Sequence, residues 1–290
     1  MGALPTANNS ADLVICIGDA IANAGIARDE ASLLLRAVTG ASRAHLIAHA
    51  DDVLTEAQSR RFAELLRRRC KGEPIAYLLG CREFYGLEFE VTPAVLIPRP
   101  ETELLVDLAL ETLAQQTSAR VLDLGTGSGA IALSLAKQRP DIEVVAVERS
   151  AEALDVAGRN LRSLLPARHR VSLLQGDWYR PVSGLSFDLI LSNPPYVAAT
   201  DPHLVQGDLC FEPKRALVGG DDGLDAIREI VSGAARHLVP GGHLFFEHGY
   251  DQSEACRQLL EAAGFASLIA LADLAGIPRV AGGRMPGTAS

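Results

Sequence analysis

Apolar residues in the first part of the chain recur at helical spacing, which predicts a small helical bundle over residues 1–80. Ser10 is placed to cap a first helix, and Asp29 to cap a second helix that stops at Gly40. Thr55-x-x-Gln58 is typical of a capping box and predicts the start of another helix. We therefore expect an all-α domain at the N-terminus.

A different pattern follows over residues 81–98. Its apolar and turn-forming positions are Phe84, Leu87, Phe89 and Val91, with Gly86 and Pro93. Short alternating runs around a glycine are typical of a β-hairpin. We expect this segment to link the bundle to a second domain over residues 99–290.

Apolar strand-like segments then alternate with helical ones. The strand candidates are Arg120–Leu124, Glu143–Glu148, Val171–Gln175, Phe187–Ser192 and His243–Glu247. Strands that alternate with helices predict an α/β domain, in which a parallel sheet is covered by helices on both faces.

A glycine-rich turn follows the first of these strands and leads into a helix at about Ile131. The glycines of Gly125–Gly129 allow positive φ and a close approach of the backbone to a ligand. The helix N-terminus favours a negatively charged group. The spacing Gly125-x-Gly127-x-x-Ala130 also fits a dinucleotide-binding fingerprint, so two classes of cofactor compete.

Asp123 favours one of the two. A carboxylate so close to the turn would repel a pyrophosphate, but it would attract the ammonium and sulfonium groups of S-adenosylmethionine. Glu148 ends the second strand and can accept hydrogen bonds from the ribose hydroxyls of either cofactor. Trp178, the single tryptophan, can cover an adenine ring or serve only in packing.

The fourth strand ends in Asn193-Pro194-Pro195-Tyr196, because two prolines cannot continue a hydrogen-bonded ladder. The turn presents the Asn193 amide, the Pro194 carbonyl and the Tyr196 ring, which together suit a planar substrate that bears an NH2 group. In a doubly wound sheet, the first and fourth strands flank the point where the strand order reverses. We therefore expect the glycine loop and this acceptor pocket to face one crevice.

Composition narrows the function further. The net charge of -9 argues against a protein that binds nucleic acid directly. The five cysteines are scattered without a C-x-x-C pair, which argues against disulfides and a metal site. We recognise no signal peptide or membrane span, so we expect a cytoplasmic protein that does not bind membranes, with a monomer as the default.

The glycine loop and Asn193–Tyr196 together resemble the class I S-adenosylmethionine-dependent methyltransferases. More narrowly, the chain is similar to the bacterial release factor glutamine methyltransferase (PrmC/HemK) family. The similarity also includes Pro74–Gly80, Glu83–Leu87, Ile97–Glu103, Glu212-Pro213, Glu247-x-Gly249-x-x-Gln252 and Asp273–Gly276. One departure is Glu148, where the family more often has Asp, although the carboxylate is kept.

The resemblance implies a Rossmann-like methyltransferase domain with a mostly parallel seven-stranded sheet, preceded by a helical bundle that docks the substrate. It implies S-adenosylmethionine as cofactor, S-adenosylhomocysteine as product, and the glutamine of the Gly-Gly-Gln motif in class I peptide chain release factors as acceptor. The expected cofactor-binding residues are Asp123, Gly125, Thr126, Gly127, Ser128, Gly129, Glu148, Trp178 and Asn193. The expected substrate-binding residues are Asn193, Pro194, Pro195 and Tyr196, of which Asn193, Pro194 and Tyr196 are the candidate catalytic residues.

No base strong enough to deprotonate an amide is evident, so we expect catalysis by positioning. The Asn193 oxygen and the Pro194 carbonyl would accept the two N–H bonds of the target amide, while Tyr196 packs on its flat face. The alternatives are methylation of a ribosomal protein glutamine, methylation of adenine in DNA, a nicotinamide oxidoreductase and a non-enzymatic binding protein. The segment Pro98–Glu103 counts against the first, the net charge against the second, and Asp123 with Asn193–Tyr196 against the third.

Overall fold

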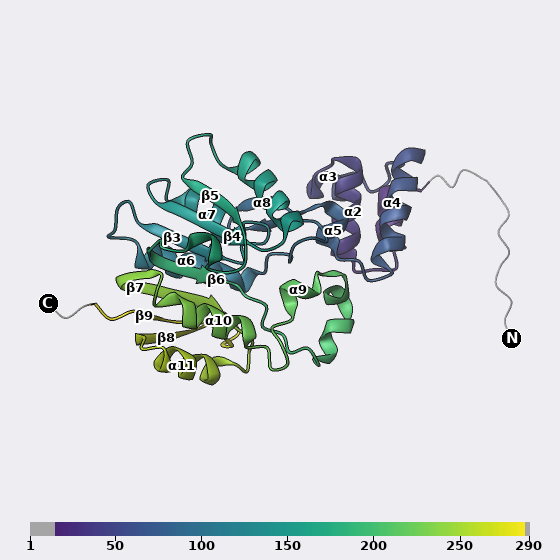
Figure 1. The fold of residues 1–290 in the computed structure, drawn as a ribbon. Helices are drawn as coiled ribbons and strands as arrows, with labels where there is room; N and C mark the ends of the chain where they lie inside the picture. Colours follow the sequence, from purple (N-terminus) through teal and green to yellow (C-terminus); the bar gives the residue numbers. More distant parts are fainter. Residues whose placement is uncertain (1–14, 288–290) are drawn as a thin grey trace. The chain divides into compact units, whose positions relative to one another are not determined.

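The computed structural model describes residues 15–287, and the chain divides into two compact units, Met1–Leu79 and Gly80–Ser290 (Figure 1). The first unit contains the helices α1 (Ile17–Ala22), α2 (Arg28–Thr39), α3 (Arg43–Ala48), α4 (Glu56–Arg69) and α5 (Ile75–Leu79). Its core includes Leu34, Leu35, Phe62 and Leu65, so the predicted helical bundle is confirmed.

The helix ends of this unit follow the predicted caps in part. Thr55 forms the expected capping box at the start of α4, and Gly40 ends α2 with φ 71°. The prediction for Asp29 was wrong, because Ala27 precedes the first helical residue and Asp29 lies in the first turn. A carboxylate there is still favourable, since it faces the positive end of the helix dipole. Ser10 lies outside the described residues.

The second unit begins with the predicted hairpin, made of β1 (Cys81–Phe84) and β2 (Leu87–Glu90). Its two turn residues, Tyr85 and Gly86, have φ of 53° and 71°. Positive φ at both positions is typical of a type I′ turn, which matches the twist of paired strands. The two strands carry Phe84 and Phe89 into the core of the unit, where their rings lie 6.1 Å apart.

A seven-stranded sheet forms the centre of this unit, in the order β5-β4-β3-β6-β7-β9-β8. Its strands are β3 (Arg120–Leu124), β4 (Glu143–Glu148), β5 (Val171–Gln175), β6 (Phe187–Ser192), β7 (Leu238–Glu247), β8 (Ala266–Ala272) and β9 (Pro278–Arg284). The pairs from β5 to β7 are parallel, and β9 is antiparallel to both of its neighbours. The predicted mostly parallel seven-stranded sheet is therefore confirmed.

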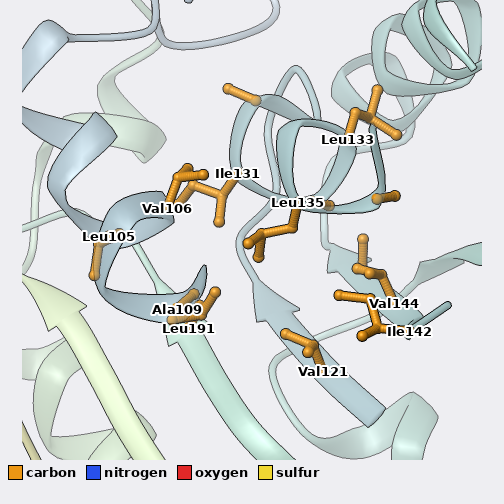
Figure 2. Packing of buried hydrophobic residues seen from close by; sticks show 14 of the residues in the cluster. Leu105, Val106, Ala109, Val121, Ile131, Leu133, Leu135, Ile142, Val144 and Leu191 are labelled. Atoms are coloured by element: carbon orange, nitrogen blue, oxygen red, sulfur yellow. The ribbon is translucent and has the colours of Figure 1, made fainter. Parts of the chain in front are cut away.

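Helices cover both faces of the sheet (Figure 1). The helices of this unit are α6 (Glu103–Thr112), α7 (Ala130–Gln138), α8 (Ala151–Leu164), α9 (Lys214–Leu217), α10 (Asp225–Ala234) and α11 (Ser253–Ala262), with short 3-10 helices at Pro100–Thr102, Arg180–Val182, Pro202–Val205 and Gly207–Phe211, and the four-residue α9 lies in a loop away from the strands. Figure 2 shows α6 and α7 packed on one face, where Val121 and Leu191 meet Leu105, Ile131 and Leu135. The opposite face carries Leu122, Leu124 and Ile190 against α10 and α11.

The strand order reverses between β3 and β6, as the sequence predicts. These strands are paired in register, Leu124 opposite Ser192, and the Ser192 hydroxyl donates to the Leu124 carbonyl at 2.7 Å. Gly125 and Asn193 therefore leave the sheet as neighbours at its carboxyl edge, where α/β folds bind their ligands. Among the described residues, no helix is long and apolar enough to cross a membrane.

Candidate functional site

A cavity of about 580 Å³ opens at the carboxyl edge of the sheet, wholly within the second unit. The predicted site residues that line it are Gly125, Thr126, Gly127, Ser128, Glu148, Trp178, Asn193 and Pro195. The remaining predicted residues, Asp123, Gly129, Pro194 and Tyr196, are not among its lining residues. Residues of the glycine loop and of the acceptor turn thus share one cavity, and the other four predicted residues belong to the same two segments or to the strand before the loop.

The glycine loop has a backbone that only glycine adopts without strain. Gly125, Gly127 and Gly129 have φ of 73°, 56° and 88°. A Cβ on Gly129 would also lie 2.9 Å from Leu133 Cδ1, at the start of α7. The loop is therefore a smooth backbone surface at a helix N-terminus, which suits an anionic group such as a carboxylate.

One buried side chain ties this loop to the hairpin. The Asn160 amide on α8 donates to the carbonyls of Ser128 at 2.9 Å and Glu90 at 3.0 Å. Its oxygen accepts from the Glu90 amide at 2.7 Å. Asn160 therefore fixes the end of β2 and the cofactor loop to the same point of α8.

Glu148 stands at the end of β4 with both carboxylate oxygens held by backbone amides. Oε2 accepts from Gly127 at 3.0 Å, and Oε1 accepts from Ser150 at 2.8 Å. Each carboxylate oxygen has a further lone pair, and the residue lines the cavity. The side chain is thus oriented to accept hydrogen bonds from a diol such as a ribose.

Asp123 is fully buried on β3, on the sheet face that α7 covers, because it alternates with Leu122 and Leu124. Its Oδ2 accepts from the Thr126 hydroxyl at 2.6 Å, while Oδ1 has no hydrogen-bond partner within residues 15–287. Burial raises the pKa of this carboxyl to about 7, nearby Glu148 adds to the rise, and the Thr126 hydrogen bond opposes it. Any negative charge on Asp123 acts on the cavity from behind the loop, through a medium of low polarity.

Trp178 adopts a positive φ of 45°, which is uncommon for a bulky residue. Its ring packs partly on the core and lines the cavity, 3.8 Å from the position that a Cβ on Gly125 would take. The structure therefore gives the indole both a packing contact and one face toward the cavity.

Asn193 has the most informative contacts in the cavity. Its Nδ2 donates to the Thr102 hydroxyl oxygen at 3.0 Å, and that hydroxyl donates to Glu247 Oε2 at 2.6 Å. The Asn193 Oδ1 atom is buried and has no hydrogen-bond partner among the described residues. An unpaired buried acceptor costs free energy, so this oxygen is placed to receive a donor from a ligand.

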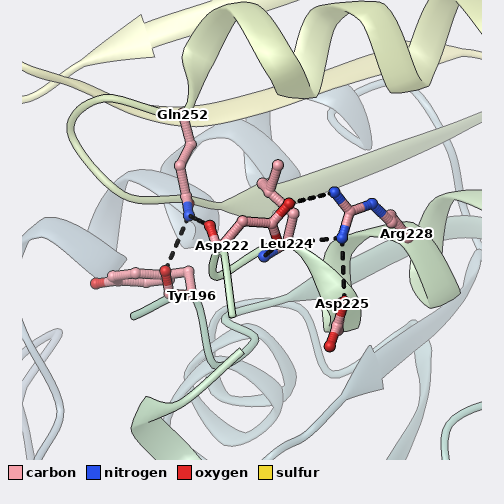
Figure 3. Close-up of polar contacts among 6 residues, drawn as sticks. All are labelled: Tyr196, Asp222, Leu224, Asp225, Arg228 and Gln252. Carbon is pink, nitrogen blue, oxygen red and sulfur yellow. Dashed lines mark hydrogen bonds and ion pairs between the residues drawn. The ribbon is translucent and has the colours of Figure 1, made fainter. Parts of the chain in front are cut away.

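Tyr196 is held at both ends. Its hydroxyl donates to Glu247 Oε1 at 2.9 Å, and its carbonyl accepts from Gln252 Nε2 at 2.9 Å, a contact that Figure 3 shows. Gln252 also donates to the Asp222 carbonyl at 3.4 Å, and Arg228 pairs with the Asp222 carboxylate in the same view. Burial, and then the charge of Glu247, raises the pKa of the Tyr196 phenol. Its hydroxyl is thus committed to the interior of the protein.

A partly buried ion pair lies next to residues that line the cavity. The Arg99 guanidinium pairs with the fully buried Glu212 carboxylate, which also accepts from the Ile97 amide at 3.1 Å. The neighbouring residues Ala94–Leu96 and Pro98 line the cavity. The Glu212 segment therefore fixes the chain that leads from the hairpin into α6.

Sequence reasoning did not assign roles to Thr102, Glu247 and Gln252. Thr102 and Glu247 are 4% and 1% exposed, although both are polar. Buried polar residues at the end of a strand or helix are a signal of a specific network. That signal needs burial, which a single sequence does not report.

The donor and acceptor groups of the cavity fit S-adenosylmethionine. The glycine loop at the N-terminus of α7 suits the carboxylate of the cofactor. Glu148 suits its ribose, and the buried Asp123 carboxyl suits a ligand that carries positive charge. A dinucleotide, with its pyrophosphate, would meet the two carboxylates close to the loop.

Comparisons with known proteins agree with this geometry. The family model of the PrmC N-terminal domain matches residues 17–80, and the model of the methyltransferase small domain matches residues 102–220. The release factor glutamine methyltransferase of Burkholderia pseudomallei is 56% identical over 89% of this chain and 92% of its own length. Its counterpart from Escherichia coli is 46% identical over 89% of this chain and 92% of its own length.

A solved structure supports the fold. The crystal structure of a methyltransferase from Pyrococcus furiosus has a TM-score of 0.53 and 21% identity, and it covers 79% of this chain and 99% of its own. The sequence relatives carry the finer assignment, since their identity is high and extends over nearly the whole of each protein. The chain therefore belongs to the release factor glutamine methyltransferases, a family of S-adenosylmethionine-dependent protein-(glutamine-N5) methyltransferases.

Proposed function

We propose that this protein transfers the methyl group of S-adenosylmethionine to the glutamine side-chain nitrogen of the Gly-Gly-Gln motif in class I peptide chain release factors. Membership of the family supports methylation of a glutamine amide. The observation that carries the acceptor chemistry is the Asn193 Oδ1 atom, which is buried in a residue that lines the cavity and has no hydrogen-bond partner in the part of the chain that the structure describes. It offers an acceptor to one N–H of a primary amide.

The residues of the glycine loop and its neighbours would hold the cofactor. Gly125–Gly129 would receive the amino acid part, Glu148 the ribose hydroxyls and Trp178 the adenine, while Asp123 would supply negative charge from below. When bound, S-adenosylmethionine supplies a methyl group on a sulfonium centre. Each of these residues would bind or orient the cofactor, and none of them would form or break a covalent bond during the methyl transfer.

Asn193 and Pro194 would act by positioning the acceptor amide. An amide nitrogen is a weak nucleophile, because its lone pair is delocalised into the carbonyl. The Asn193 oxygen and the Pro194 carbonyl would accept the two N–H bonds and aim the nitrogen along the line of displacement. Near-attack positioning contributes about 7–11 kcal/mol in favourable cases. The same two acceptors stabilise positive charge that develops on nitrogen, and the proton then leaves to solvent.

Tyr196 and Pro195 would complete the acceptor pocket. Pro195 lines the cavity, and Tyr196 is half-buried. The Tyr196 hydroxyl donates to Glu247, and its backbone carbonyl accepts from Gln252. We propose that this rigid backing lets the turn present its backbone acceptors without rearrangement. Rigidity of this kind is the structural basis of preorganised catalysis.

The helical unit would dock the release factor, with residues 1–80 as the docking domain, 81–98 as the linker and 99–290 as the methyltransferase domain. The names of the relatives support a release factor as the partner. The net charge of -9 supports a protein partner over direct binding of nucleic acid, and the protein would act as a monomer.

The test is incubation with labelled S-adenosylmethionine and, in parallel, a release factor, the same factor with its Gly-Gly-Gln glutamine replaced by alanine, a ribosomal protein fraction, and duplex DNA. We expect label only in the intact release factor. Label in DNA or in the ribosomal protein would support one of the alternative acceptors and refute the proposal.

Asn193→Ala tests the proposed role of the acceptor turn. We expect kcat to fall by about 10²–10³-fold, as for the loss of a preorganised transition-state contact, with the cofactor Kd changed only a few-fold. Gln258→Ala is the matched control, because Gln258 is an exposed amide side chain on α11 that donates to Glu254 at 2.9 Å. Turnover by Asn193→Ala at the wild-type rate would remove Asn193 from the mechanism.

A further inference from the structure

A buried chain of hydrogen bonds lies behind the acceptor turn and connects three distant segments. It runs from the Asn193 amide to the Thr102 hydroxyl and on to the Glu247 carboxylate. We propose that Thr102 and Glu247 are positioning residues, which decide that the oxygen of the Asn193 amide, and not its NH2 group, faces the acceptor. This inference rests on the proposed role of Asn193.

The direction of the chain follows from counting hydrogens. A threonine hydroxyl has one hydrogen, and an ionised carboxylate accepts only. Burial raises the pKa of Glu247, and the hydrogen bonds from Thr102 and Tyr196 oppose this rise by favouring the ionised form, to which the following direction applies. The Thr102 hydrogen points to Glu247 Oε2 at 2.6 Å, so the Thr102 oxygen has only lone pairs to offer to Asn193. It must therefore meet the NH2 group of Asn193, at 3.0 Å.

The alternative orientation of the Asn193 amide, with its oxygen toward Thr102, is unfavourable for two reasons. It would set the Asn193 oxygen against the Thr102 oxygen, two acceptors in contact. It would also turn the NH2 group toward the NH2 group of the incoming glutamine, two donors in contact. The network therefore selects the only orientation in which Asn193 can accept a hydrogen bond from the substrate.

The same carboxylate also fixes the other end of the acceptor turn. Glu247 Oε1 accepts from the Tyr196 hydroxyl at 2.9 Å, while Gln252, after the end of β7, holds the Tyr196 carbonyl at 2.9 Å. Gln252 is itself oriented by the Gly249 amide, which donates to its Oε1 at 2.8 Å. The segment Glu247-x-Gly249-x-x-Gln252 thus forms one support for the turn.

Glu247 and Gln252 are buried and are not among the residues that line the cavity, so their proposed roles act through the residues that they hold. Thr102 does line it, which makes the choice of substitution important. Valine has nearly the shape of threonine but lacks the hydroxyl. Thr102→Val therefore removes the hydrogen bond to Asn193 with little change in the wall of the cavity.

The experiment compares Thr102→Val with Thr102→Ser, which keeps the hydroxyl, and with Thr112→Val as a matched control at the far end of α6. For each variant we would measure kcat and KM with the release factor, the Kd of S-adenosylmethionine by calorimetry, and the melting temperature. A second readout uses protein without cofactor, labelled with ¹⁵N at its five asparagines. Hydrogen exchange of the Asn193 NH2 group, assigned by its absence in Asn193→Ala, reports the bond to Thr102.

We expect Thr102→Val to lower kcat about 10- to 100-fold, which corresponds to the loss of one well-placed interaction. KM and the cofactor Kd should stay within a few-fold, and the Asn193 NH2 group should exchange faster. Thr102→Ser should restore most of kcat and slow exchange, and Thr112→Val should change neither. A kcat within twofold of wild type in Thr102→Val, or unchanged exchange, would overturn the inference.

Glu247→Gln provides a second variant in case Thr102→Val is unstable. A glutamine has one oxygen in place of two, so either Thr102 or Tyr196 loses its acceptor, and kcat should fall. Wild-type kcat in Glu247→Gln would count against the inference. The outcomes of the two proposals can be told apart. No label in the release factor would refute the proposed function, and full turnover in Asn193→Ala would remove Asn193 from the mechanism. The exchange measurement tests the orientation of the Asn193 amide in either case.

Discussion

The buried carboxyl of Asp123 makes the stability of the methyltransferase unit depend on pH. Its pKa is raised from 3.8 to about 7, mainly by burial. The folded protein therefore keeps a proton that the unfolded chain loses between these two pH values. The stability that this proton contributes is fully present below about pH 4 and is lost as pH rises through about 7.

The size of the effect follows from the two pKa values. A rise from 3.8 to about 7 corresponds to about 4 kcal/mol over the full range. Between pH 5 and pH 8, where the protein is convenient to handle, Asp123 should lower the free energy of unfolding by about 2–3 kcal/mol. Asp123→Asn cannot ionise, so the stability of this variant relative to wild type should rise by that amount over the same interval.

Urea unfolding, followed by the fluorescence of Trp178, measures this difference. Trp178 is the only tryptophan and lies in the second unit, so its signal reports the unit that contains Asp123. Asparagine can still accept from Thr126, but its NH2 group would replace the unpartnered Oδ1, which adds a cost that does not depend on pH. The relevant quantity is therefore how the difference in free energy of unfolding between the variant and wild type changes with pH, and not the absolute free energy of unfolding.

The control is Asp155→Asn, which removes an exposed carboxylate from α8. A difference between Asp123→Asn and wild type that stays constant from pH 5 to pH 8 would refute the raised pKa. In parallel, Asp123→Asn should bind S-adenosylmethionine more weakly, because it removes negative charge from beneath the loop. An unchanged Kd would remove the proposed electrostatic role of Asp123.

Two further substitutions test how the cofactor loop is held. Gly129→Ala should lower the free energy of unfolding by about 1–3 kcal/mol and weaken cofactor binding, because φ is 88° and the new Cβ would lie 2.9 Å from Leu133 Cδ1. Gly264→Ala, with φ of 83° and nothing within 4 Å, is the matched control for backbone strain alone, and equal losses in both would exclude the Leu133 contact as a cause. Asn160→Asp should lower the free energy of unfolding by about 3 kcal/mol or more and weaken cofactor binding, because the Ser128 and Glu90 carbonyls lose their donor. Melting curves and calorimetry measure the two effects, and wild-type values in both would contradict the prediction.

The buried parallel strands could be predicted almost residue by residue. Arg120–Leu124, Glu143–Glu148, Val171–Gln175 and Phe187–Ser192 have the same bounds in the sequence analysis and in the structure. Most of these are apolar runs covered on both faces, and such runs leave a strong signal in composition alone.

The part of the sheet from β7 to β8 was harder to predict. β7 begins at Leu238, five residues before the predicted His243, because Pro240-Gly241-Gly242 reads as a break although it continues the strand. β9 contains Gly282, where a Cβ would lie 2.3 Å from the Leu244 carbonyl oxygen. A glycine that local sequence rules assign to a turn is here required by close packing of two strands.

The parts of the site that are continuous in the sequence could be predicted, but the contacts between residues far apart in the sequence could not. The glycine loop and the Asn193–Tyr196 turn are continuous segments, and Gly125–Ser128, Asn193 and Pro195 from them line one cavity. The Asn193–Thr102 and Thr102–Glu247 hydrogen bonds join residues 91 and 145 positions apart. No spacing rule connects such positions, and Glu247 could be quoted only as part of a family pattern.

The long reach of these bonds has a consequence for protein engineering. A designer who copied only Asn193–Tyr196 into another methyltransferase would transfer the side chains without the contacts that orient them. The unit to be transplanted includes the start of α6 and the end of β7, which supply Thr102, Glu247 and Gln252. Because these parts come from three separate stretches of chain, we expect that recombination between distant relatives will succeed only when all three are inherited together.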